Sequence, residues 1–267
     1  MINLNFGLWW SGAKLSYLRY LTFKSLRHFH PHSRIQLFTS NKFCNNDTMG
    51  VSQEFITPNS IEKDYLSNLS TLDVEIAQMD KFGKYAPNHQ SDIFRWWFLR
   101  EFGGIYLDTD QIILKSFKSL PLKDNDFMYS AYDVKSPYAF DGKFSPVGVL
   151  GADQRSKALK SIAVKVLDYY KPDDYNCLGP LMFADMLKKL DLDRSFNAPS
   201  EYFYPAAICD KMEAVYSGDM ELPRDSYSLH WFGGYNASQR FNRAYTEGFA
   251  QESNDTISKI LRRNKII

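Results

Sequence analysis

The order of hydrophobic and polar positions predicts strands and helices that alternate along the chain. Ile2 to Leu8 alternates loosely, which predicts a first strand, and Leu15 to Phe29 carries apolar residues at helical spacing. Pro31 ends this helix, and Arg34 to Thr39 predicts a second strand. A strand, a helix and a second strand in this order are typical of a parallel sheet, so the chain opens as an α/β protein.

The centre of the chain has a helix, a glycine break and a short strand. Ser91 is a favourable N-cap for a helix from Asp92 to Phe102, which Gly103 and Gly104 end. Ile105 to Leu107 then predicts a short buried strand. Further helices are predicted at Ile61–Asn68, Ser156–Tyr170 and Pro180–Leu190, and further strands at Phe127–Tyr132 and Val147–Gly151. No repeat or linker divides the sequence, so we expect one domain over residues 1–267.

Composition is that of a soluble globular protein. The 267 residues are 44% hydrophobic and 24% charged, and the net charge of +1 gives no indication of a nucleic-acid partner. Cys44, Cys177 and Cys209 have neither a metal-site spacing nor a disulfide framework, which favours a reducing compartment. No apolar run reaches the length of a membrane span, and Met1 to Trp10 does not have the pattern of a signal peptide. We therefore expect a cytoplasmic protein.

Two acids follow the predicted strand Ile105 to Leu107. Asp108 and Asp110 are one residue apart, so both can address one hard divalent cation through oxygen. Ligands of open α/β sheets bind at such strand ends, and a cation held there is suited to a diphosphate. The pattern favours a nucleotide-sugar enzyme, although a solvated turn is the commoner origin of two acids at this spacing.

Asp92 and Arg95 are three residues apart and share one face of the predicted helix. A carboxylate there can accept hydrogen bonds from sugar hydroxyls, and a guanidinium can bind a phosphate oxygen. An ion pair on the helix surface explains the same spacing, so both interpretations stay open.

These residues together resemble a known family. Ser91 to Arg95, with Leu99 and the run Gly103 to Asp110, is similar to the DXD-containing sugar-binding region of the GT-A glycosyltransferases of family 32. That family resembles the large clostridial glucosylating toxins more distantly. Similar elements follow the family order, so the resemblance covers roughly residues 2–240; they are Trp9-Trp10-Ser11-Gly12, Gly179-Pro180, Tyr202-Phe203-Tyr204-Pro205 and His230-Trp231 with Gly233-Gly234. It implies a Rossmann-like GT-A domain with a mixed central sheet and additional helices.

The resemblance implies a metal site of three residues. Asp110 would chelate Mn²⁺ or Mg²⁺ directly, and Asp108 would contact the ribose and the metal. His230 would approach the metal or the diphosphate from the C-terminal side. A satisfied loop histidine is the alternative for His230.

The resemblance also implies contacts to the donor. Trp10 would stack on the nucleobase, Tyr106 would support the site, and Trp231 would cover the leaving diphosphate. Asp92 and Arg95 would bind the transferred sugar. The chain lacks the family's Pro-Lys-Ile-Ile-His lead, so its base contacts follow less directly than its metal site.

The implied activity is a retaining, metal-dependent transfer of a hexose or N-acetylhexosamine from a UDP-sugar. The acceptor would be a glycan or a lipid-linked oligosaccharide in surface polysaccharide synthesis. No residue stands out as a nucleophile, and Asp141, in a loop with Tyr138 and Phe140, is a candidate for acceptor contact.

Two other functions fit parts of the pattern. A phosphatase of the haloacid dehalogenase type also places an Asp-x-Asp after a strand, and Gly218-Asp219 offers a later acidic motif. Its Thr or Val two residues after the second Asp is absent, because Gln111 and Ile112 follow Asp110. A non-catalytic carbohydrate-binding or nucleotide-sugar-binding protein is the second alternative.

The C-terminal residues 255–267 mix basic and aliphatic side chains. Such a helix could lie on an anionic membrane surface, at the inner face of the membrane, and bring the enzyme to a lipid-linked acceptor. A terminal helix packed on the domain explains the composition equally well.

Overall fold

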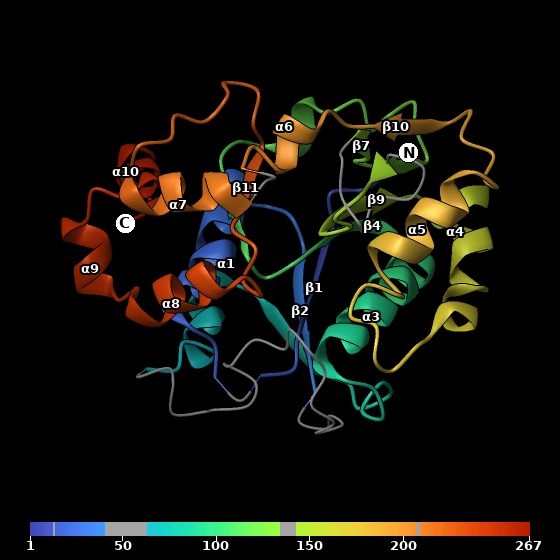
Figure 1. Ribbon diagram of the computed structural model, residues 1–267, viewed down its shortest axis with the longest axis horizontal. Coiled ribbons are helices and arrows are strands. Elements are labelled where there is room, and N and C mark those ends of the chain that lie inside the picture. The colour runs from blue at the N-terminus through green and yellow to red at the C-terminus, as the bar shows by residue number, and fades with distance from the viewer. Residues whose placement is uncertain (13, 41–62, 134–142, 207–208) are drawn as a thin grey trace.

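A mixed β-sheet separates two groups of helices (Figure 1). The structure is a computed structural model that describes residues 1–12, 14–40, 63–133, 143–206 and 209–267. The central sheet has seven strands in the order β10-β6-β9-β4-β1-β2-β3. The predicted α/β class with a mixed central sheet is confirmed.

One strand gives the sheet its mixed character. β9 runs antiparallel to its neighbours β4 and β6, whereas the other neighbouring strands are parallel. From one edge to the other the strands are β10 (Ser195–Asn197), β6 (Phe127–Tyr129), β9 (Val149–Ala152), β4 (Gly104–Leu107), β1 (Phe6–Trp10), β2 (Ile35–Thr39) and β3 (Glu75–Gln78). β4 and β1 are parallel neighbours, so their carboxyl ends meet at one edge of the sheet, where α/β proteins bind ligands.

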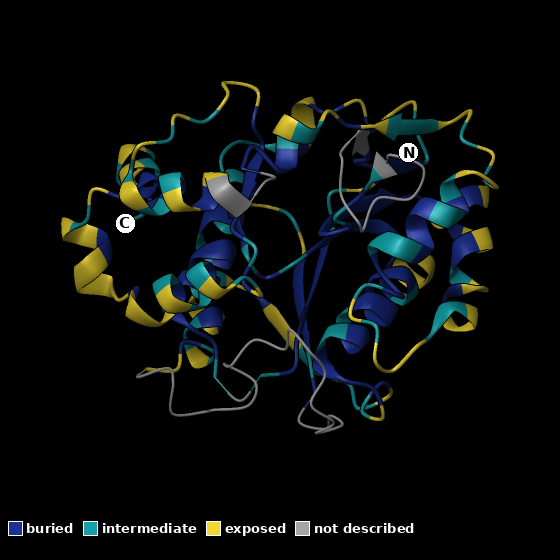
Figure 2. Cartoon of the chain, in the orientation of Figure 1, coloured by how far each residue is buried: buried dark blue, intermediate teal, exposed yellow. Residues whose placement is uncertain are grey.

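Helices α1 (Tyr17–Phe29) and α3 (Pro87–Phe102) pack on opposite faces of this sheet, and Figure 2 shows the strands buried between them. α1 begins where Ser16 accepts a hydrogen bond from the Arg19 amide. α3 lies close to β1 because Gly7 has no side chain: a Cβ there would be 2.4 Å from the Phe98 ring. On the same side as α3 are α4 (Lys157–Ala163) and α5 (Pro180–Leu187).

Several predicted helix boundaries are wrong: the helix predicted over Pro180–Leu190 ends at Leu187, and the helix predicted from Leu15 begins at Tyr17. α3 begins at Pro87, with Ala86 as its N-cap, and not at Ser91. Proline suits the first turn of a helix, and Ser91 instead donates to the Asn88 carbonyl from within it. The predicted Ser156–Tyr170 helix is divided into α4 and a 3₁₀ helix, Val166–Tyr169.

Shorter elements connect these parts. In the region of the predicted Ile61–Asn68 helix the structure has a 3₁₀ helix, Ser67–Leu72, and residues 61 and 62 lie outside the described part. Another 3₁₀ helix spans Phe117–Ser119, and β7 (Tyr132–Asp133) pairs with β8 (Lys143–Phe144).

The C-terminal part of the chain returns to the site edge through a separate two-stranded sheet. In it, β11 (Ser228–His230) pairs antiparallel with β5 (Gln111–Ile113), which follows the two acids. The helices of this part are α6 (Ser200–Phe203), α7 (Cys209–Ser217), α8 (Asn236–Ala244), α9 (Glu247–Glu252) and α10 (Thr256–Arg263).

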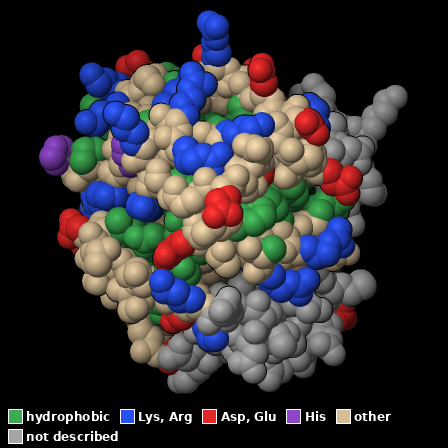
Figure 3. Space-filling view, turned by 90° about the vertical axis from the view of Figure 1, so that its left-hand side faces the viewer, with side chains coloured by type: hydrophobic (Ala, Val, Ile, Leu, Met, Phe, Trp, Pro, Cys, Tyr) green, Lys and Arg blue, Asp and Glu red, His purple; other side chains and the backbone are tan. Residues whose placement is uncertain are grey.

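The apolar side of the C-terminal helix α10 packs on the domain. Ile257 and Leu261 are fully buried, and Arg262 donates to the carbonyls of Ala250 and Ser253, both over 2.6 Å. Figure 3, which views this side of the molecule, shows Lys and Arg side chains interspersed with Asp and Glu. The apolar side of α10 is therefore used in packing, and contact of its basic side with a membrane stays a prediction. No helix in the described ranges is long and apolar enough to span a bilayer.

Candidate active site

The two acids lie on the turn that links β4 to β5. The Asp108 amide donates to the Gly148 carbonyl over 2.8 Å, which fixes the start of the turn against the segment before β9. The Gly233 amide donates to Asp110 Oδ2 over 2.6 Å, which fixes its end. The turn is therefore held by segments that lie far from it in the sequence.

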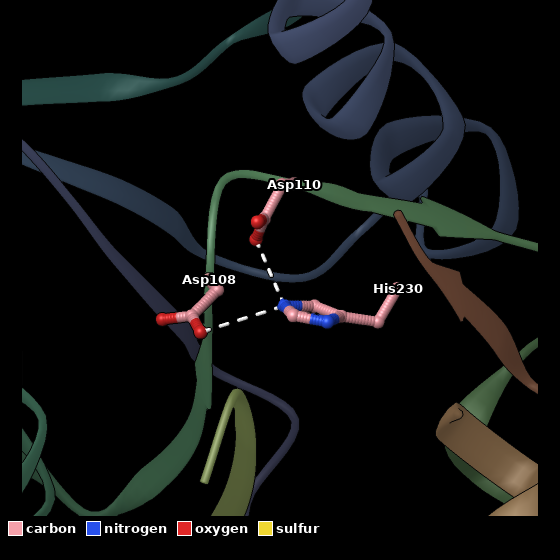
Figure 4. Close-up of side chains that lie close together, drawn as sticks. All are labelled: Asp108, Asp110 and His230. Atoms are coloured by element: carbon pink, nitrogen blue, oxygen red, sulfur yellow. Dashed lines mark ion pairs between the residues drawn. The ribbon is translucent and has the colours of Figure 1, made fainter. Parts of the chain in front are cut away.

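His230 reaches the two acids from β11. Figure 4 shows its imidazole between them, with Nε2 3.0 Å from Asp110 Oδ1 and 3.6 Å from Asp108 Oδ2. The Trp231 amide donates to the Asp110 carbonyl over 3.0 Å, so the backbone of β11 is locked to the acid turn. The three predicted metal-binding residues are thus brought together, each with a ligand atom within 4.8 Å of the others.

Charge in this cluster is shared between the acids and the histidine. Burial opposes ionisation of Asp110, but His230, Arg19 and the Gly233 amide outweigh it and hold its pKa below the usual value. Burial also opposes the charged form of His230 and so lowers its pKa. The carboxylates of Asp110 and Asp108 outweigh this effect and raise the pKa of His230 to about 9. Three ionisable groups with little exposure are the pattern expected of a binding site rather than a structural turn.

The cluster has the donor set and the space for a hard divalent cation. A Cβ at Gly148 would lie 2.7 Å from Asp108 Oδ2 and 3.2 Å from His230 Nε2, so the absence of a side chain there leaves their inner side open. Although His230 Nε2 is close to both acids, it is not aligned for a hydrogen bond with any described group. Two carboxylates and an imidazole fit Mn²⁺ or Mg²⁺.

Arg95 and Asp92 form a buried ion pair on α3, with Nη2 2.8 Å from Oδ1. Their side chains are only 5% and 9% exposed, so the interpretation as a surface pair is wrong. Arg95 also donates to the Val147 carbonyl over 2.9 Å and lies 3.5 Å from Asp108 Oδ1. Burial raises the pKa of Asp92 to about 6 despite the guanidinium beside it. Arg95 therefore links the predicted sugar-binding carboxylate to the turn that carries Asp108 and Asp110.

Two further features complete this side of the site. The Tyr106 hydroxyl donates to Asp108 Oδ1, and the Arg95 guanidinium lies over the Tyr106 ring, 4.9 Å from its centroid. Val147 has a φ of 52°, a left-handed conformation that costs a β-branched residue about 1–3 kcal/mol and directs its carbonyl to Arg95. Tyr106 lies where a supporting residue was predicted.

Trp10 and Trp231 enclose the guanidinium of Arg19. The guanidinium carbon lies 4.5 Å from the Trp10 ring centroid and 5.1 Å from that of Trp231, and both indoles are almost fully buried. Their predicted contacts to the nucleobase and the diphosphate stay predictions. Asp141, the candidate for acceptor contact, lies outside the described residues.

Sequence reasoning missed the residues that hold the turn from helix α1. Arg19 donates to the Thr109 hydroxyl over 2.9 Å, and Thr22 donates to the Thr109 carbonyl over 2.8 Å. Gly148 was missed as well, because an isolated glycine before a strand carries no signal for a site. Only the fold brings these residues to Asp108 and Asp110.

The sheet and the site have the arrangement that the resemblance to GT-A glycosyltransferases implies. Residues 19–127, which include the Asp92–Arg95 pair and both acids, match the family described as "Glycosyltransferase sugar-binding region containing DXD motif". The match covers less than half of the chain, and over these residues the resemblance seen in the sequence is confirmed.

Curated relatives and solved structures agree with this class. The human and chimpanzee proteins named lactosylceramide 4-alpha-galactosyltransferase are 28% identical over 167 residues, which cover 57% of this chain. The match covers 43% of those relatives, so the chain spans less than half of their length.

Two solved structures share the fold. The PaToxG glycosyltransferase superposes with a TM-score of 0.50 at 18% identity, over 70% of this chain and 69% of that one. The glycosyltransferase GlyE of Streptococcus pneumoniae TIGR4 has the same TM-score and identity, over 99% of this chain and 61% of that one. At such identities the likeness extends to the fold alone.

Proposed function

We propose that this protein transfers a hexose or N-acetylhexosamine from a UDP-sugar, with Mn²⁺ or Mg²⁺, and retains the anomeric configuration. The acceptor would be a glycan or a lipid-linked oligosaccharide in surface polysaccharide synthesis. The observation that carries the proposal is the convergence of Asp108, Asp110 and His230 within 4.8 Å at the sheet edge.

The donor set supports the metal and the diphosphate. Asp108, Asp110 and His230 would hold the cation, which supplies positive charge for the diphosphate as the sugar leaves. The protein's own groups would keep the acids in place before the donor binds. The Gly233 amide donates to Asp110, and Arg19 on helix α1 donates to Thr109 between the two acids.

Asp92 and Arg95 divide the sugar-binding role. Arg95 has acceptors in Val147, Asp92 and Asp108, so its charge holds these groups in register. The Asp92 carboxylate would accept hydrogen bonds from sugar hydroxyls. Gly179 leaves it room, since a Cβ there would lie 3.0 Å from Asp92 Oδ1. The pair would orient the sugar above the cation-binding acids.

Similarity to the named relatives supports the hexose. The human protein is named for galactosyl transfer to lactosylceramide in an α linkage, and this agrees with a sugar acceptor and with retention. The match covers less than half of that protein, so its substrates are not assigned to this chain. The cytoplasmic location expected from the sequence stays a prediction.

A donor screen tests the proposal. UDP- and GDP-sugars are incubated with the protein, with and without Mn²⁺, and the released nucleotide is measured. We expect one UDP-sugar to be consumed only with metal, and Asp110→Ala to abolish turnover. Asp225→Ala is the matched control, because this acid is 80% exposed and lies outside the site.

The binding-protein alternative makes a different prediction in the same assay. A non-catalytic protein would bind a nucleotide sugar, detected by calorimetry, without releasing nucleotide. The phosphatase alternative does not agree with the GT-A fold or with the family match. If no donor is either bound or consumed, the donor site is wrongly assigned.

A further inference from the structure

Gln111, the residue directly after the second acid, is fully buried. Neither its amide oxygen nor its amide nitrogen has a hydrogen-bond partner in the part of the chain that the structure describes. A buried amide without hydrogen bonds destabilises the fold, because it has lost its bonds to water. The next two residues, Ile112 and Ile113, are apolar and are buried without such a cost. The stability cost points to a partner that Gln111 acquires in another state of the site.

The strand pairing places that partner opposite. Gln111 and His230 are Cα partners on β5 and β11. Hydrogen-bonded and non-hydrogen-bonded pairs alternate in an antiparallel ladder, and Trp231 is hydrogen-bonded to Asp110 over 3.0 Å. Gln111 and His230 therefore form a non-hydrogen-bonded pair. In such a pair the side chains project from the same face and approach each other most closely.

His230 has a complementary unused group. Its Nε2 lies toward Asp108 and Asp110, while Nδ1, on the other side of the ring, is buried and has no partner among the described residues. When Nε2 coordinates a cation, Nδ1 carries the proton and needs an acceptor. Histidines that bind metals almost always donate this proton to a carboxylate, a carbonyl or water.

We propose that Gln111 is a positioning residue for the metal site: its amide oxygen accepts a hydrogen bond from Nδ1–H of His230. This bond would hold the imidazole in the tautomer whose Nε2 lone pair faces the two acids. The inference rests on the proposed function, because it requires that Asp108, Asp110 and His230 bind a cation. It assigns to β5 a second role beyond carrying Asp110.

Mn²⁺ binding by the full chain tests the inference. Free Mn²⁺ is titrated by electron paramagnetic resonance, without nucleotide, into the parent, Gln111→Leu and Ser228→Ala. Ser228, on the paired strand β11, is the matched control, because it is also buried and its hydroxyl has no partner among the described residues. We expect Gln111→Leu to raise the Kd for Mn²⁺ about tenfold or more, and Ser228→Ala to leave it within twofold.

Stability separates positioning from simple packing. Leucine removes the unpartnered amide, so Gln111→Leu should have a Tm equal to or above that of the parent even though it binds Mn²⁺ more weakly. A lower Tm accompanied by an unchanged Kd would overturn the inference, since Gln111 would then act only in packing. Asp110→Ala is run alongside: if it binds Mn²⁺ as the parent does, the metal site itself is wrong.

The tautomer gives a direct readout. Long-range ¹⁵N–¹H spectra of the imidazole, with Mg²⁺ and with His230→Asn for assignment, should show a protonated Nδ1 in the parent. In Gln111→Leu we expect a mixture of tautomers. A parent that binds Mg²⁺ with the proton on Nε2 would contradict the proposed hydrogen bond.

Discussion

Arg19 donates a hydrogen bond from Nη1 to the hydroxyl of Thr109 over 2.9 Å, and so ties helix α1 to the residue between the two acids. Thr22, one turn further along α1, donates to the carbonyl of the same threonine. The turn that carries Asp108 and Asp110 is thus held by side chains of α1, which lies on the face of the sheet opposite to α3. A turn held in this way need not order itself when a donor binds.

Loss of the threonine hydroxyl should weaken both stability and activity. Thr109→Val keeps the shape but removes an acceptor of a buried guanidinium, which we expect to lower the free energy of unfolding by about 1–2 kcal/mol. The looser turn should lower kcat/KM for donor hydrolysis about tenfold. Urea unfolding and the released-nucleotide assay measure the two effects. Thr71→Val, at an exposed hydroxyl, should change neither.

A methyl group at Gly148 should close the metal site. Its Cβ would lie 2.7 Å from Asp108 Oδ2 and 3.2 Å from His230 Nε2, and its backbone φ is not left-handed, so the effect is one of space. Gly148→Ala should lower metal-dependent turnover about 100-fold. Gly248→Ala, where a Cβ would meet no atom of the described residues within 4 Å, should keep full turnover and gain about 0.4–1 kcal/mol of stability. Equal turnover in the two variants would contradict the role of Gly148 in leaving space beside Asp108 and His230.

Arg95 should not be replaceable by lysine. Three acceptors, Asp92, Asp108 and the Val147 carbonyl, surround its planar guanidinium, and one ammonium group cannot serve all of them. We expect Arg95→Lys to lower the free energy of unfolding by about 3 kcal/mol, measured by urea unfolding, and to reduce turnover about 100-fold. Arg100→Lys, exposed on the same helix, should stay within about 0.5 kcal/mol of the parent.

Acid should destabilise the protein through His30, which lies outside the site. Burial, together with the charge of Lys118, lowers its pKa to about 4, and its Nε2 accepts a hydrogen bond from the Phe117 amide. Between pH 6.5 and 4 the unfolded chain binds the proton more readily than the folded one. The contribution is therefore complete above about pH 6.5, and up to about 3 kcal/mol is lost as pH falls toward 4.

Unfolding in urea at pH 7 and at pH 5 measures this loss. His30→Gln should reduce the difference between the two pH values, because its amide does not titrate. His32→Gln, at an exposed position, should leave the difference unchanged. A pH dependence that survives in His30→Gln would assign the effect to other groups.

The sequence predicted those parts of the fold that depend on local chemistry. Gly103 closes α3 with a φ of 64°, as a helix-ending glycine does, and the strand after it is buried as its apolar residues suggested. Ser91 misled because it follows Pro87 by less than a helical turn and a half, and proline begins the helix at least as well. The direction of the apolar face of α10 could not be predicted from the sequence, because only the folded chain shows that Ile257 and Leu261 pack on the domain.

The site was predictable where one short segment carries it. The spacing of Asp108 and Asp110 indicates a site, whereas His230 could be assigned to it only by resemblance to the family. Arg19, Gly148 and Gln111 could not be found, because their relation to the acids exists only after β1, β4 and β9 pair and β11 returns to β5. Tertiary pairing, not propensity, creates these contacts.

The β5–β11 ribbon joins Asp110 to His230, which lie far apart in the chain. Any ligand that engages both side chains acts as a reversible cross-link between the central sheet and the C-terminal part. Its binding free energy then opposes local opening of β11, by an amount that grows with the logarithm of ligand concentration. Resistance of the C-terminal segment to proteolysis would therefore report how much cation and donor are present.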